Sequence, residues 1–87
     1  MATVHLPASL VRLFPGAAQR VELSAESVRE VVKQLDQRWP GMWERVCDAG
    51  PEIRRHLNVF VDGERAGLDT PVGAASEVRI MTAVSGG

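Results

Sequence analysis

One stretch of this 87-residue chain has helical periodicity over several turns, and it limits the fold more than any other feature. Apolar residues recur at three- and four-residue spacing from Val28 to Trp39, with charged and amide side chains between them. Ser27 and Glu30 have the spacing of a capping box, and Pro40 breaks the pattern. A single amphipathic helix covers only one face of a sheet. The sequence therefore predicts an α+β fold of two layers.

The other regular segments alternate apolar and polar residues with the period of a β-strand. We expect the first two to pair as a hairpin and Asp62-Gly63 to form the turn of a second hairpin. The expected strands are residues 3–6, Arg20–Leu23, 56–61, Glu64–Ala66 and 77–81. Pairing the first and last strands at the centre of a four- or five-stranded sheet buries both. That arrangement is the β-grasp.

Two shorter apolar segments lie between these elements. Residues 8–14 are expected to form a loop or one helical turn on the core, and residues 42–48 a short second helix. This second helix turns Trp43, Val46 and Cys47 inward. We find no linker or internal repeat and expect one domain over residues 1–87.

Composition restricts the partners and the compartment. The apolar share is 45%, the charged share is 24%, and the net charge is −1, so no overall field favours nucleic acid or an anionic membrane. No secretory leader or membrane-spanning window is evident, so a cytoplasmic location is expected. Cys47, the single cysteine, excludes an internal disulfide and a cysteine-based metal cluster. No intrinsic cofactor, metal or catalytic residue is expected.

The chain ends on two glycines directly after the last predicted strand, and residues 83–87 are expected to form a flexible tail. Glycine has no Cβ, so Gly86 and Gly87 are able to approach another surface closely. Judged alone, the same residues also suit a frayed terminus or a cloning remnant.

The whole chain resembles the MoaD/ThiS group of ubiquitin-like sulfur carriers, which serve molybdenum cofactor, thiamine and cysteine biosynthesis. The resemblance rests on the first strand, the helix opened by Ser27, the hairpin over residues 58–63, and above all the ending at residues 83–87, Ala-Val-Ser-Gly-Gly. The ending looks closer to carriers for cysteine synthesis, or to stand-alone MoaD-like proteins, than to the thiamine carrier. Met81-Thr82 departs from the family, in which a Leu-Pro or similar pair is common. This departure bears on partner preference.

The resemblance implies a chemistry for the terminal glycine. A ubiquitin-activating-like adenylyltransferase uses ATP to adenylate Gly87, and sulfur then displaces AMP to leave a thiocarboxylate. Gly86, with Ser85, Val84 and Ala83, threads the tail into the partner's channel. The partner positions and stabilises the acyl transfer. A sulfur-accepting enzyme, either a molybdopterin synthase large subunit or a cysteine synthase type, is the second partner.

The sheet face without the helix is expected to meet solvent or a partner. Alternation places Phe60, Arg79 and Met81 outward on neighbouring strands. Outward apolar side chains that cluster mark interaction sites, and ubiquitin-like proteins bind partners through this face. The alternative is isolated surface hydrophobic residues.

Four functions remain open from the sequence. The first is a free sulfur carrier, a protein co-substrate without catalytic activity. The others are the small subunit of molybdopterin synthase, a ubiquitin-like protein modifier, and an interaction module with an inert tail. His5 and His56 each stand alone on a strand with no carboxylate at a telling spacing, so a packing or surface role is expected for both.

Overall fold

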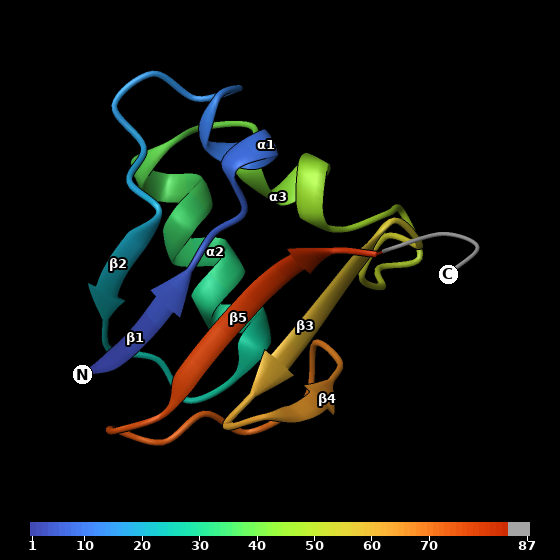
Figure 1. The fold of residues 1–87 in the computed structure, drawn as a ribbon. Coiled ribbons are helices and arrows are strands. Elements are labelled where there is room, and N and C mark those ends of the chain that lie inside the picture. Colours follow the sequence, from blue (N-terminus) through green and yellow to red (C-terminus); the bar gives the residue numbers. More distant parts are fainter. Residues whose placement is uncertain (84–87) are drawn as a thin grey trace.

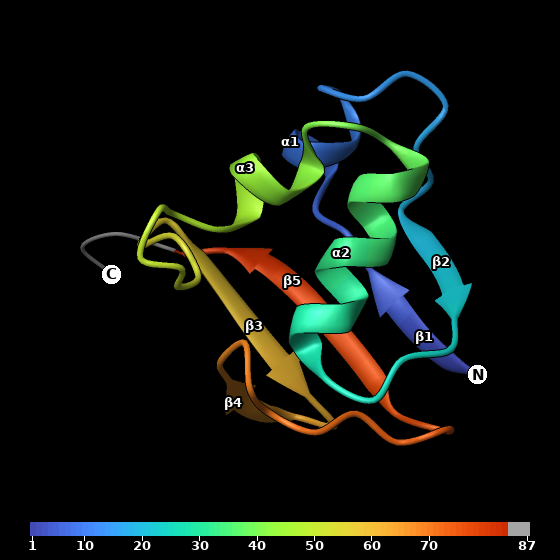
Figure 2. The same ribbon diagram turned by 180° about the vertical axis from the view of Figure 1, so that it is seen from behind.

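The computed structural model describes residues 1–83, which form a five-stranded mixed sheet with helices against one face (Figures 1 and 2). The strands are β1 (Ala2–His5), β2 (Arg20–Leu23), β3 (Leu57–Val61), β4 (Glu64–Ala66) and β5 (Glu77–Thr82). The helices are α1 (Ala8–Val11), α2 (Val28–Arg38) and α3 (Met42–Val46). The strand order is β2-β1-β5-β3-β4, with β1 and β5 parallel at the centre. The predicted β-grasp is confirmed.

Helix α2 begins at the predicted cap. Ser27 Oγ accepts a hydrogen bond from the Glu30 N–H at 3.2 Å, and Glu30 Oε2 accepts one from the Glu26 N–H at 2.6 Å. The helix lies across the face of the sheet that is turned toward the viewer in Figure 2. Its buried residues, all on the predicted apolar face, are Val28, Val31, Val32 and Leu35.

The core forms between α2 and the inward side of the strands. Alternate strand residues are buried, among them Val4, Val59 and Ile80, while the residues between them are exposed or half-buried. This period of two is what a sheet with one covered face requires. Asp62 and Gly63, with φ of 51° and 86°, form the predicted turn between β3 and β4.

Several boundaries differ from the prediction by one or two residues. β1 ends at His5 rather than at residue 6, because Pro7 follows as the cap residue of α1, although the Leu6 N–H still bonds to Gln19 O. α3 is shorter than residues 42–48, because Cys47 is extended and bridges to Ile53. Trp43 is only half-buried, although it was expected to turn inward.

Candidate functional site

The end of β5 is where the C-terminal residues leave the sheet. Thr82 pairs with Leu57 of β3, and the Ala83 N–H donates to His56 O at 2.8 Å. The ladder therefore anchors the chain through Ala83, which was predicted to be the first residue of the tail. The other four predicted tail residues lie outside the described part of the chain: Val84, Ser85, Gly86 and Gly87.

β5 extends beyond β1 at this end of the sheet, as Figure 1 shows. The β1–β5 register ends at His5 opposite Arg79, whereas the β3–β5 register continues to Thr82. The last residues of β5, 80–82, therefore pair with β3 but not with β1. Met81 lies in this stretch and is 49% exposed.

The predicted interface residues come together on the open face of the sheet. Phe60 is directly opposite Arg79 across the β3–β5 pair, and Asn58 is opposite Met81. Arg79 and Met81 are exposed and Phe60 is half-buried. Cross-strand partners of this kind lie within about 5 Å at Cβ, so the guanidinium stem and the aromatic ring share one patch. The sequence placed all three on the correct face.

A charged cluster lies next to this patch. Glu77 Oε1 is 3.2 Å from His5 Nε2 and 3.9 Å from an Arg79 guanidinium nitrogen. No carboxylate lies at a telling spacing from His5 along the sequence, and its partner in the structure comes from a distant strand. Glu77 is 72 residues away along the chain, and parallel pairing of β1 with β5 brings the two together.

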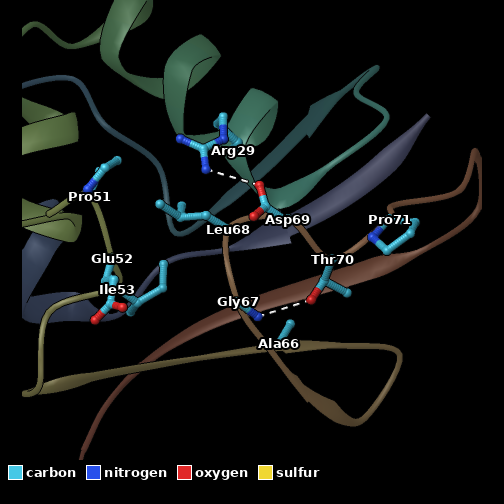
Figure 3. Close-up of a pocket in the computed structure, with 10 residues that line it drawn as sticks. All are labelled: Arg29, Pro51, Glu52, Ile53, Ala66, Gly67, Leu68, Asp69, Thr70 and Pro71. Atoms are coloured by element: carbon cyan, nitrogen blue, oxygen red, sulfur yellow. Dashed lines mark hydrogen bonds and ion pairs between the residues drawn. The ribbon is translucent and has the colours of Figure 1, made fainter.

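A separate hollow of about 740 Å³ lies between the start of α2 and the segment after β4 (Figure 3). Arg29 reaches across it to Asp69 at 2.9 Å, and Thr70 Oγ1 accepts the Gly67 N–H at 3.0 Å. The Val28 N–H also bonds to Thr70 O. These contacts tie the 67–70 turn to the first turn of α2, and they give the hollow a structural role.

Two titratable groups, Cys47 and Asp48, have shifted pKa values, and each shift has a structural cause. Burial raises the pKa of the Cys47 thiol to about 11, which keeps it protonated and unreactive. Hydrogen bonds from the Gly50 and Glu52 N–H groups lower the pKa of the Asp48 carboxyl. Residues 1–83 contain no group of three potential metal ligands. None of the helices in this part of the chain has the length and apolar character that crossing a bilayer demands.

Comparison with known families gives one match over nearly the entire chain. A profile of the ThiS family matches residues 4–87. The chain belongs to the ThiS family. The sulfur carrier protein CysO of Mycobacterium tuberculosis is 29% identical over 91 residues, which cover 98% of this chain and 97% of the relative.

Solved structures of related proteins share the fold of this ThiS-family chain. CysO in the Amycolatopsis orientalis BexX/CysO complex has a TM-score of 0.85 at 27% identity, and the match covers both chains fully. CysO of Mycobacterium tuberculosis has a TM-score of 0.84 at 27% identity, over 97% of this chain and 100% of that one. The small archaeal modifier protein 1 of Methanosarcina acetivorans has a TM-score of 0.77 at 26% identity, with coverage of 99% and 95%.

Proposed function

We propose that this ThiS-family chain is a sulfur carrier whose terminal carboxylate, on Gly87, is adenylated and then converted to a thiocarboxylate. The observation that supports this most strongly is the family match, which runs through the terminal glycine pair. The fold supports it as well, because β5 leads directly from the sheet into these residues and is held by β3 as far as Ala83.

In this scheme the folded domain binds the partner enzymes, and the reaction takes place at the terminal carboxylate. A carboxylate is a poor electrophile, because it is anionic and its leaving group would be oxide. An activating adenylyltransferase therefore forms the acyl-adenylate from ATP, with release of pyrophosphate. A sulfur nucleophile then displaces AMP. Gly86 lets the tail pass a channel that is too narrow for a Cβ, with Val84 and Ser85 leading into it.

Phe60, Arg79 and Met81 provide the docking surface for the partner. Met81 and Phe60 supply apolar area on an otherwise polar face, and Arg79 adds a charge that favours an acidic surface on the partner. Because the curated relatives are CysO sulfur carriers, cysteine biosynthesis is the pathway we favour for the acceptor enzyme. The complex of a CysO protein with BexX shows that a relative binds a second protein. Molybdopterin synthase is the alternative acceptor.

A second candidate function is attachment of Gly87 to protein lysines. The likeness to the small archaeal modifier protein 1 favours it, since that protein shares both fold and length with this chain. Adenylation is common to both functions. The two diverge in the acceptor of the acyl group, which is sulfur in one case and an amine in the other.

ATP–pyrophosphate exchange tests the proposal. The purified chain is mixed with an adenylyltransferase from its host, ATP and labelled pyrophosphate. Exchange that requires the chain and disappears when Gly87 is deleted supports the proposal. Exchange that survives the deletion contradicts it. A sulfur donor is then added: a thiocarboxylate product favours the carrier, and an amide on lysine favours the modifier.

A further inference from the structure

The hydrogen-bond pattern of β5 leaves one edge of its last residues without a ladder partner in the described part of the chain. Bonded pairs alternate along an antiparallel ladder. The Ala83 N–H donates to His56 O, and Glu77 O accepts from the Asp62 N–H at 2.9 Å, so residues 77, 79, 81 and 83 bond to β3. The backbone groups of Ile80 and Thr82 consequently point to the other side, toward β1.

Pro7 stops the β1 ladder at this point. The parallel register begins with the Thr3 N–H donating to Ser76 O and reaches His5 opposite Arg79. In the next step of a parallel ladder, residue 7 donates its N–H to Ile80 O and accepts the Thr82 N–H. Pro7 has no N–H to donate. Its carbonyl oxygen already accepts from Leu10 and Val11, at 3.0 and 3.1 Å, in the first turn of α1.

Space for another chain exists beside this edge. A hollow of about 340 Å³ is bounded by His5, Leu6 and Pro7 on one side and by residues 79–82 on the other. Its lining is more apolar than polar. Thr82 and Met81 are both exposed. An exposed strand edge beside an apolar hollow is the geometry in which an extended peptide adds to a sheet.

We propose that residues 80–82 form a strand-addition site for an extended segment of the partner enzyme that receives the tail. The segment donates an N–H to Ile80 O and accepts the Thr82 N–H, while one of its side chains enters the hollow beside Pro7. The inference rests on the proposed function, because a partner that binds the residues after Ala83 also meets the end of β5, which leads into them.

Thr82→Pro removes the donor at this edge, and Thr82→Ala is the matched control that keeps it. The fold does not use the Thr82 N–H, so we expect both variants to melt at the wild-type temperature. Ala83→Pro, in contrast, removes the bond to His56 and lowers the melting temperature. Binding is measured with the host's adenylyltransferase by titration calorimetry.

We expect Thr82→Pro to weaken binding about tenfold, as the loss of one or two hydrogen bonds predicts, and Thr82→Ala to change it less than about twofold. Because proline also fixes φ, a second form carries an N-methyl group on the Thr82 amide. It is made by ligating residues 1–46 to a synthetic 47–87 peptide at Cys47. This form is expected to bind like Thr82→Pro.

Hydrogen exchange provides the direct readout. In the free chain the Thr82 amide is expected to exchange fast, between the slow amides of Met81 and Ala83, and to become protected in the complex. Unchanged exchange at Thr82 in the complex overturns the inference. Equal binding by wild-type and Thr82→Pro chains, or protection caused by a dimer of this chain, overturns it as well. Binding of the wild-type chain without pyrophosphate exchange contradicts the proposed function instead, so the two failures are distinguishable.

Discussion

Phe60 of β3 and Arg79 of β5 are direct cross-strand partners on the open face of the sheet. Glu77 lies two residues earlier on β5, and its Oε1 is 3.9 Å from a guanidinium nitrogen of Arg79. Met81, two residues later, is half-exposed at the point where the chain leaves the sheet. Along β5 toward the tail, the face thus changes from acidic to basic to apolar. A partner that docks here contacts both charged and apolar side chains.

Met81→Asp tests whether this face binds the partner. The side chain is 49% exposed, so we expect the free energy of unfolding to change by less than about 1 kcal/mol. Partner binding is expected to weaken at least about tenfold, because a charge enters an apolar contact. Phe60→Asp is expected to act in the same direction with a larger loss of stability, since Phe60 is half-buried.

Ala18→Asp is the control for Met81→Asp. Ala18 is an exposed apolar residue in the loop before β2, away from the end of β5, so the substitution adds the same charge outside the open face. Calorimetry with the adenylyltransferase is expected to give wild-type affinity for this variant. Equal weakening by both variants argues for a general effect of the added charge. A collapse of the fold in Met81→Asp means that the face is part of the core.

Ser27→Ala is expected to lower the free energy of unfolding by about 1 kcal/mol, since it removes the acceptor for the Glu30 N–H at the start of α2. Ser24→Ala makes the same chemical change at an exposed position, where the serine hydroxyl has no hydrogen-bond partner within residues 1–83. Urea denaturation compares the two. Equal effects of the two substitutions are incompatible with a capping role for Ser27.

Cys47 is expected to make the fold less stable at high pH. Burial raises its pKa from 9.0 to about 11, so the unfolded chain ionises first as pH rises. Stability from this group is complete below pH 9 and is lost as pH rises toward 11. The total loss is about 3 kcal/mol, since each pKa unit corresponds to about 1.4 kcal/mol. Denaturation of wild type and Cys47→Ala across this range measures it, and parallel curves for the two contradict the assignment.

Much of the fold follows from patterns that are local in the sequence. The periodicity from Val28 to Trp39 predicted the covering helix, and the period of two in residues 57–61 predicted both faces of β3. The capping box and the Asp62-Gly63 turn are also local signals. These features depend on the spacing of neighbouring residues, which is why one sequence suffices to predict them.

The features that sequence did not predict depend on pairing between distant strands. The contact of His5 with Glu77 requires the parallel register of β1 and β5. The open edge at Ile80 and Thr82 requires that register together with the turn at Pro7. Neither appears as a motif along the chain. The expected placement of Gly86 and Gly87 lies outside the described residues and stays a prediction.

Intact-mass spectrometry of the chain, purified from its native host, tests the central claim most directly. The account predicts a population in which one terminal oxygen is replaced by sulfur, with tandem fragmentation placing the added mass on Gly87. A chain that lacks Gly87, expressed in the same host, is expected to keep its fold by circular dichroism and to gain no additional sulfur atom. An additional sulfur atom on the shortened chain, or on an internal residue such as Cys47, would contradict the account.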